Sequence, residues 1–206
     1  MKKTGTFIAI EGIDGCGKTT LITFLKERLT QENIPTVFTK EPGGSALGRP
    51  LRELLNQQPV PIDPKAEFLL FAADRAQHMR EVIMPGLGRG EMIITDRCAD
   101  SSLAYQGYGL GLDKEMIRQI NRWAMNDIQP DTVIYLRLSP EQSMERIKTH
   151  RAHKTTFELR PLSFWEKVLN GYDEIFKERD NVITIDAMLS PEQVLETAWQ
   201  AIRKFL

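Results

Sequence analysis

The chain carries, at residues 6–20, the run TFIAIEGIDGCGKTT, in which an apolar, β-prone segment leads into a glycine-rich turn and then an amphipathic segment. Residues 12–19 read GIDGCGKT and match the P-loop pattern G-x-x-x-x-G-K-[ST] in the strand, loop and helix context that this pattern requires. Glycines let consecutive backbone N–H groups turn toward a phosphate, and the N-terminus of the following helix favours the same anion. An ordinary glycine-rich turn beside a surface lysine is the alternative. We expect the loop to bind a nucleoside triphosphate.

The side chains of this loop have distinct expected roles. Lys18 offers a mobile cation to the β- and γ-phosphates, and the hydroxyl of Thr19 is a ligand for Mg²⁺. The residues expected to contact the triphosphate form one continuous segment: Gly12, Ile13, Asp14, Gly15, Cys16, Gly17, Lys18, Thr19 and Thr20.

The composition narrows the class of protein. A length of 206 residues fits one α/β domain, which we expect to span residues 1–206. The 27 basic residues are balanced by 28 acidic ones, so no nucleic-acid partner is expected. Glu11 interrupts the first apolar run before it reaches the length of a signal peptide core, and the run 68–73 is far shorter than the roughly 20 residues that span a bilayer. Two cysteines suit a reducing compartment, so we expect a soluble, cytoplasmic protein without membrane contact.

Predicted strands and helices alternate along the chain, which favours a parallel sheet covered by helices on both faces. The apolar runs MIIT at 92–95 and TVIYL at 132–136 are typical of strands buried on both faces. We predict strands at 6–11, 36–40, 92–96, 132–137 and 182–186. We predict helices at 18–32, 45–57, 65–84, 113–127, 139–149, 162–179 and 190–204. The helices at 139–149 and 190–204 begin with the same capping sequence, Ser-Pro-Glu-Gln.

Charged and glycine-rich residues follow the predicted strands, at the sheet edge where ligands bind in open α/β folds. Asp96 and Arg97 end the third strand. In P-loop proteins an acid at this place lies near Mg²⁺ or orients its water, and an arginine beside it suits an enzyme that holds a second phosphate. A structural ion pair is the alternative. The turn KEPGG at 40–44 permits close approach to a ligand, although a plain helix-entry loop explains it equally well.

Two further groups of side chains are candidates for ligand binding. Phe71 and Arg75 are four residues apart and share one helix face, where a ring and a guanidinium suit a base and its carbonyl oxygen. Core packing with a surface arginine is the alternative. Basic residues crowd positions 146–160, where Glu158 is the only acid, and this segment is either a solvated helix and loop or a lid over a polyphosphate.

Together these motifs resemble thymidylate kinase, in the bacterial form with a basic lid, over nearly the whole chain. The resemblance is carried by EGIDGCGKTT at 11–20, EPGG at 41–44, FAADR at 71–75, and Asp96-Arg97 followed by DSSLAYQG at 100–107. It implies a P-loop nucleoside monophosphate kinase-like three-layer α/β fold with a five-stranded parallel sheet and a lid at about 146–160. It also implies a homodimer that uses ATP and Mg²⁺ to phosphorylate dTMP to dTDP in dTTP biosynthesis.

The resemblance assigns roles in the acceptor site. It implies that Phe71 stacks on thymine, that Arg75 donates to its O4, and that Ser102 and Gln106 meet the remaining polar edge. Tyr105 is expected near the deoxyribose. The further acceptor-site residues that the resemblance implies are Arg52 and Arg97 at the dTMP phosphate, with Glu41 and Pro42 nearby.

The resemblance also assigns the chemistry of transfer. Asp14 is expected near the sugar 3′-hydroxyl and the magnesium-bound phosphates, Asp96 and Thr19 near the metal, and Arg146 near ATP. In-line positioning and charge neutralisation perform most of a phosphoryl transfer, so no general base is required. The expected catalytic residues are Lys18, Asp14, Arg97 and Arg151.

Two departures from the family pattern affect these expectations. Cys98 follows Asp96-Arg97, where relatives carry an aromatic residue or histidine. Before Glu158 this chain has TTF at 155–157, where relatives with a basic lid often have Asp-Arg. We therefore expect Arg151, with Lys154 as second choice, to supply the lid cation. Cys16 and Cys98 are either small neutral fillers or redox-sensitive thiols near a phosphate site.

Other classes of protein remain as alternatives. The first is another nucleoside monophosphate kinase. The second is a P-loop nucleotide switch, which hydrolyses its nucleotide slowly and has no acceptor substrate. A binding module with a degenerate P-loop is disfavoured, because Lys18, Thr19 and Asp96 are all present.

Overall fold

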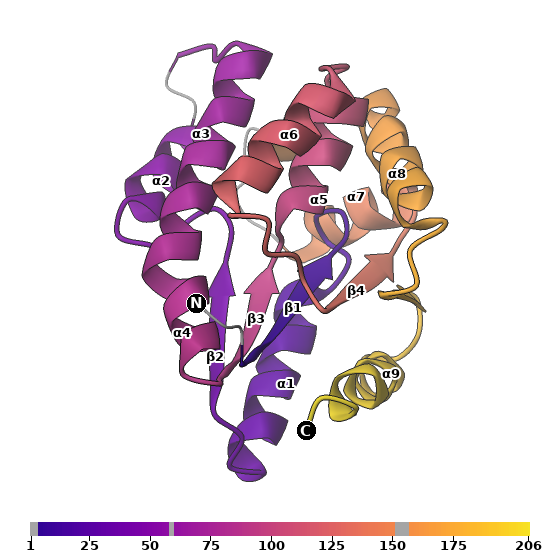
Figure 1. Cartoon of the computed structure of the whole chain (residues 1–206). Helices are drawn as coiled ribbons and strands as arrows, with labels where there is room; N and C mark the ends of the chain where they lie inside the picture. The colour runs from indigo at the N-terminus through magenta and orange to yellow at the C-terminus, as the bar shows by residue number, and fades with distance from the viewer. Residues whose placement is uncertain (1–3, 58–59, 151–156) are drawn as a thin grey trace.

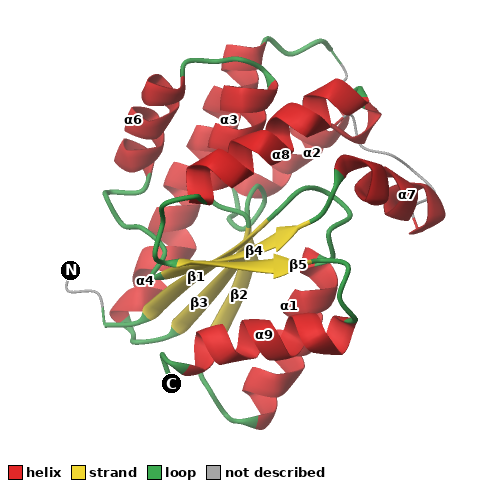
Figure 2. Ribbon diagram, turned by 90° about the vertical axis from the view of Figure 1, so that its right-hand side faces the viewer, coloured by secondary structure: helices red, strands yellow, loops and turns green. Residues whose placement is uncertain are grey.

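The computed structural model describes residues 4–57, 60–150 and 157–206. Its centre is a five-stranded parallel sheet (Figures 1 and 2), whose strands lie in the order β2 (Thr36–Lys40), β3 (Met92–Asp96), β1 (Thr6–Glu11), β4 (Thr132–Arg137) and β5 (Val182–Asp186). These bounds are the predicted ones. In the middle of the sheet, Ile8 pairs with Ile94 on one side and Thr132 on the other.

Helices cover both faces of the sheet, which gives the predicted three layers. Figure 2 shows α1 (Lys18–Gln31) and α9 (Pro191–Arg203) on one face, and α3 (Pro64–His78), α6 (Lys114–Ala124) and α8 (Leu162–Phe176) on the other. The remaining helical segments are α2 (Gly48–Gln57), η1 (Met79–Ile83), α4 (Met84–Gly88), α5 (Ala99–Ser102), η2 (Leu103–Gly109), α7 (Pro140–His150) and η3 (Phe157–Leu159). In the described part of the chain, no helix has the length and apolar character needed to cross a membrane.

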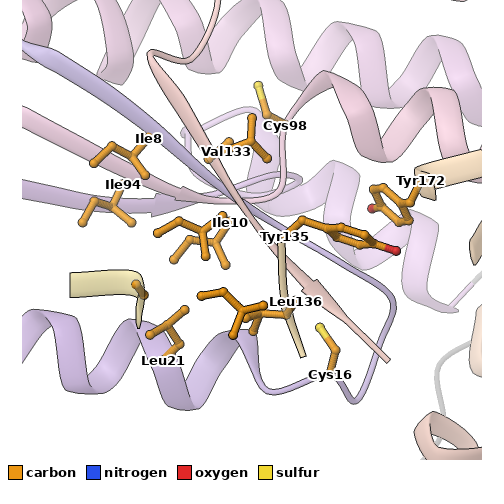
Figure 3. Packing of buried hydrophobic residues seen from close by; sticks show 14 of the residues in the cluster. Ile8, Ile10, Cys16, Leu21, Ile94, Cys98, Val133, Tyr135, Leu136 and Tyr172 are labelled. Carbon is orange, nitrogen blue, oxygen red and sulfur yellow. The ribbon is translucent and has the colours of Figure 1, made fainter. Parts of the chain in front are cut away.

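The core lies between β1 and the helices on either side (Figure 3). Ile8 and Ile10 of β1 and Val133 of β4 are completely buried, and Leu21 of α1 packs into the same cluster. Successive strand residues point to opposite faces, so a strand covered on both faces must be apolar throughout. Full burial of one such side chain favours folding by roughly 1.5–3 kcal/mol. The β1 run therefore holds the P-loop on a rigid base.

The helix predicted at 113–127 ends at Ala124, and the helix predicted at 162–179 ends at Phe176. Two further differences from the predicted bounds involve particular residues. The helix predicted at 45–57 begins at Gly48, after a turn in which the Ser45 hydroxyl accepts a hydrogen bond from the Gly48 N–H at 3.0 Å. The helix predicted at 65–84 is α3 followed by the π-helical turn η1 and then α4. Pro85 lies in the first turn of α4 and has no N–H group, and a widened turn before it lets the chain continue.

The helical segment 99–109 was not predicted, and its packing against α8 explains it. A Cβ atom added to Gly109 would lie 2.5 Å from Phe164 Cε2, and one added to Gly171 would lie 2.7 Å from Tyr108 Cγ. Small residues on both elements thus permit close approach. Tertiary contact rather than local helix propensity forms this segment.

Candidate active site

A cavity of about 800 Å³ opens at the carboxyl edge of the sheet. This volume is within the usual range for small-molecule sites. The cavity brings together the predicted site residues Asp14, Gly15, Cys16, Gly17, Lys18, Thr19, Thr20, Glu41, Pro42, Arg52, Phe71, Arg75, Asp96, Arg97, Ser102, Tyr105, Gln106 and Arg146. Segments that are far apart in the sequence therefore form one site.

The P-loop has the backbone geometry of an anion cradle. Gly15 and Gly17 have φ angles of 76° and 101°, which side chains disfavour. Lys18 is buried, and its Nζ donates to Gly12 O at 3.1 Å and to Ile13 O at 3.0 Å. Gly12 and Ile13 do not line the cavity; they lie behind it and hold Lys18. No described side chain caps the first turn of α1 at Gly17, so its N–H groups point to an anion site.

Arg97 joins the P-loop to the acceptor side of the cavity. Its φ of 73° is strained for a residue with a side chain, and the surrounding hydrogen bonds compensate for that strain. Nη2 donates to Asp14 Oδ1 at 2.6 Å and to the Tyr105 hydroxyl at 3.0 Å. Nη1 donates to Gly12 O at 2.8 Å. The guanidinium is thus fixed between the two predicted subsites.

Behind Arg97, a buried carboxylate ties several elements together. Glu11 accepts hydrogen bonds from the Cys98 N–H at 2.8 Å, the Ser101 hydroxyl at 2.6 Å and the Tyr172 hydroxyl at 2.9 Å. Burial and, to a lesser extent, the charge of Asp100 raise the pKa of Glu11 to about 7, although Arg97 opposes the shift. Figure 3 shows Tyr172 and Cys98 at the margin of the labelled core residues. The sequence patterns did not identify Glu11 or Tyr172.

Arg75 is almost completely buried and is held by partners from three directions. Nε donates to Glu41 at 2.8 Å, Nη1 to Asn121 at 2.6 Å, and Nη2 to Cys98 O at 3.3 Å and Ser102 Oγ at 3.1 Å. Among the described residues, four of its five N–H groups therefore have protein acceptors, which leaves one on Nη1. These hydrogen bonds fix the orientation of Arg75, the arginine that the sequence predicted for this site.

Glu41 forms a buried ion pair with Arg75 and holds it in place. Its second oxygen lies 2.9 Å from His78 Nδ1. Burial alone would raise the pKa of Glu41, but Arg75 and His78 outweigh burial and lower it below its ordinary value. The carboxylate is thus kept ionised as a fixed partner for Arg75. His78 has no counterpart in the sequence-based site.

The predicted base-binding residues gather beside Arg75. The Phe71 ring lies 5.9 Å from the Phe157 ring with an interplanar angle of 57°. Ser102 and Gln106 are buried and also line the cavity. At the neighbouring wall, Arg52 Nη1 donates to Pro42 O at 2.8 Å. An aromatic face and convergent polar groups make this end suited to a flat, polar-edged ligand.

The opposite end of the cavity is bounded by α7 and by the loop after β5. Arg146 donates from Nη2 to Ala187 O at 2.8 Å, and the Ser143 hydroxyl donates to Asp14 O at 2.6 Å. The apolar residues that line this end were not predicted, namely Phe24, Leu189, Pro191 and Val194. The rule that ligands gather beyond strand ends could have pointed to the residues after β5, but no residue there was predicted.

Asp96 supports the predicted metal site. Its Oδ1 is buried and has no hydrogen-bond partner among the described residues, and Asp96 and Thr19 line the same cavity. The described residues contain no cluster of three or more metal-ligating side chains. Mg²⁺ in phosphate sites takes one or two protein ligands plus waters and phosphate oxygens, so an orphaned carboxylate oxygen and a hydroxyl fit it.

Part of the predicted lid is not described. Arg151 and Lys154, the candidates for the lid cation, lie outside the described residues. Arg160, at the end of the same segment, donates to Glu67 Oε2 at 2.8 Å.

Comparison with known proteins agrees with this geometry. The model of the family described as "Thymidylate kinase" matches residues 10–198. Thymidylate kinase of Carboxydothermus hydrogenoformans is 40% identical over 98% of this chain and 97% of its own length. That of Synechococcus sp. (strain JA-2-3B'a(2-13)) is 43% identical over 95% and 93%, and that of Bacillus velezensis is 40% identical over 98% and 97%. In the site, Arg97 connects the P-loop with the pocket around Phe71 and Arg75. Together with family and sequence matches of this extent, this arrangement shows that the chain belongs to the thymidylate kinase family.

Proposed function

We propose that this protein transfers the γ-phosphoryl group of ATP to dTMP, which yields dTDP for dTTP biosynthesis. The observation that carries the proposal is the position of Arg97, whose guanidinium contacts Asp14 of the P-loop and Tyr105 of the opposite wall. A switch that only hydrolyses its nucleotide has no need of a second, base-sized pocket in the same cavity.

Different residues of the cavity bind the phosphoryl donor, the acceptor and the metal ion. Lys18 and the N-terminus of α1 bind the ATP phosphates, and Arg97 and Arg52 hold the dTMP phosphate in line with them. Mg²⁺ supplies charge neutralisation between the β- and γ-phosphates when bound, and Asp96 and Thr19 are the residues that would hold it. We assign a further cation to Arg151 of the lid.

The hydrogen-bond donors of the pocket determine which base the acceptor nucleotide carries. Phe71 stacks on thymine, while the remaining N–H of Arg75 and the hydroxyl of Ser102 donate to O4. The Ser102 oxygen already accepts from Arg75, which leaves its O–H as a donor. Thymine differs from uracil by one methyl group, so dUMP is expected to be a poorer but real substrate.

We also propose that the protein is a cytoplasmic homodimer. Leu69 of α3 is 53% exposed, and on α6 Met116 is 54% and Trp123 81% exposed. Large apolar side chains on two neighbouring helices are typical of a protein interface. Light scattering after size exclusion should give twice the chain mass, and Trp123→Glu should shift the population toward monomer. Cys16 and Cys98 are both free, which fits a reducing compartment.

A coupled assay of ADP release tests the activity. Purified protein with ATP, Mg²⁺ and dTMP should form ADP and dTDP in equal amounts, with dTDP identified chromatographically. AMP and GMP serve as controls for another nucleoside monophosphate kinase. ADP release that is independent of dTMP, or faster with AMP, would contradict the proposal.

A further inference from the structure

A buried carboxylate lies directly behind the base-binding end of the cavity. Glu67 of α3 is only 2% exposed and does not line the cavity itself. Its Oε1 accepts a hydrogen bond from Gln106 Nε2 at 2.9 Å, and its Oε2 accepts one from Arg160 Nη2 at 2.8 Å. Glu67 therefore contacts a residue of the base pocket from the side away from the ligand.

This contact determines which way round the amide of Gln106 lies. An amide carries a donor NH₂ and an acceptor oxygen of nearly the same shape, and rotation by 180° exchanges them. An ionised carboxylate only accepts hydrogen bonds, so the NH₂ must face Glu67 and the carbonyl oxygen must face the other way. Arg160 forms an ion pair with the second carboxylate oxygen at 2.8 Å.

We propose that Glu67 is a specificity-determining positioning residue, which fixes Gln106 so that it presents a hydrogen-bond acceptor to the base. This inference rests on the proposed function, in which the base is thymine. Gln106 is itself 2% exposed and lines the cavity beside Ser102 and Arg75. The protein then offers donors to O4 from Arg75 and Ser102, and an acceptor to N3–H from Gln106.

The same arrangement excludes cytosine. Cytosine has an acceptor at N3 and an amino group at C4, so the Gln106 oxygen would face another acceptor. Sites that leave buried polar groups unpaired reject the wrong substrate by up to roughly 10⁴-fold. If the amide were free to rotate, it could instead donate its NH₂ to cytosine N3. Glu67 prevents that rotation without touching the base.

Glu67→Gln tests the inference, because Arg160 can only donate and so holds the oxygen of the new amide. The new NH₂ group then faces Gln106, whose amide must turn around to accept from it. The kcat/KM values for dTMP, dUMP and dCMP should be measured for both proteins. The preference for dTMP over dCMP should fall by at least about tenfold in the variant. The preference for dTMP over dUMP should stay within about twofold, since both bases present N3–H and O4 and differ by a methyl group. An unchanged dTMP:dCMP ratio, or an equal fall in both ratios, would overturn the inference.

Arg160→Lys is the matched control. It disturbs the same ion pair but keeps a cation beside the Glu67 carboxylate, so Gln106 stays fixed. We expect equal losses of kcat/KM with all three substrates and an unchanged dTMP:dCMP ratio; a fall in that ratio would count against the inference. If Glu67→Gln does not fold, Glu67→Leu combined with Arg160→Met replaces the pair with apolar side chains and should produce the same loss of discrimination. Wild-type protein without activity on dTMP would refute the proposed function, whereas an active wild type with an insensitive variant would refute only this inference.

Discussion

Arg97 Nη2 lies 2.6 Å from Asp14 Oδ1, so the residue that follows β3 forms an ion pair with the P-loop. Both side chains line the cavity and are only partly exposed, which weakens screening by solvent. The pair connects the site of the phosphoryl donor with that of the acceptor. A substitution that displaces Arg97 is therefore expected to disturb the P-loop as well as the acceptor site.

Arg97→Lys should lower kcat by about 10²–10³, because an ammonium group cannot reproduce the forked contacts to Asp14, Tyr105 and Gly12. Steady-state kinetics with ATP and dTMP measure the effect. Arg137→Lys is the control, since Arg137 also ends a strand but forms an exposed ion pair with Asp173. Comparable losses in both variants would show that Arg97 has no special role.

Asp96→Asn should raise the Mg²⁺ concentration for half-maximal activity by about 10- to 100-fold. The substitution preserves size but removes the charge from a buried carboxylate whose Oδ1 has no described partner. Activity titrations against free Mg²⁺ provide the measurement. Asp186→Asn, at the end of β5, should leave the titration unchanged, because Asp186 accepts only a local hydrogen bond from the Met188 N–H in the described structure.

Glu11 should make the free energy of unfolding depend on pH. Burial raises its pKa from 4.5 to about 7, so between these values the unfolded chain releases a proton that the folded protein keeps. The stabilising contribution is complete below pH 4.5 and declines by about 3 kcal/mol as the pH rises to about 7.

Glu11→Gln should remove this decline. Denaturant titrations of both proteins at about pH 5 and pH 7.5 should show the stability of wild type, relative to the variant, falling by about 2 kcal/mol. Burial also raises the pKa of Asp74 to about 6, but this contribution is present in both proteins and cancels. Parallel pH dependences would mean that Glu11 ionises normally in the fold.

Cys98 should resist alkylation in the folded protein. The thiol is buried, and burial raises its pKa well above the ordinary value, so little thiolate is present near neutral pH. Iodoacetamide at pH 7.5 should label the denatured chain but not the native one, as judged by mass spectrometry. Full activity after peroxide treatment without substrates would favour a neutral filler, and rapid native labelling would favour the redox-sensitive alternative.

The central strands β1, β3 and β4 could be predicted to the residue because their apolar runs are buried on both faces. The bounds of the edge strands β2 and β5, which are only partly buried, were also predicted correctly. The helix around 79–88 could not be predicted, because Pro85 normally ends a helix and only the widened turn at Met79–Ile83 lets this one continue. Segment 99–109 has two glycines and poor helix propensity. Its helical form depends on contacts with Phe164 and Gly171 of α8, which are far away in the sequence.

The site was predicted where motifs are local and missed where support comes from distant residues. Most of the residues assigned to the P-loop and base pocket line the cavity. Their partners Glu67, Asn121 and Tyr172 carry no recognisable spacing, because each contacts its target across a tertiary interface. Arg151 remains a prediction, since it lies outside the described residues.

Lys18, Arg52 and Arg97 all donate hydrogen bonds to main-chain carbonyl oxygens. These carbonyls help to set the position of each cation, so an incoming phosphate competes with them for it, although each cation has further N–H groups. A phosphate group with two negative charges binds these cations more strongly than a neutral carbonyl does, because charge-assisted hydrogen bonds are roughly twice as strong as neutral ones. Uncharged replacements of the phosphate, such as methylphosphonate esters or sulfonamides, are poorer competitors and should leave the cations bound to the backbone.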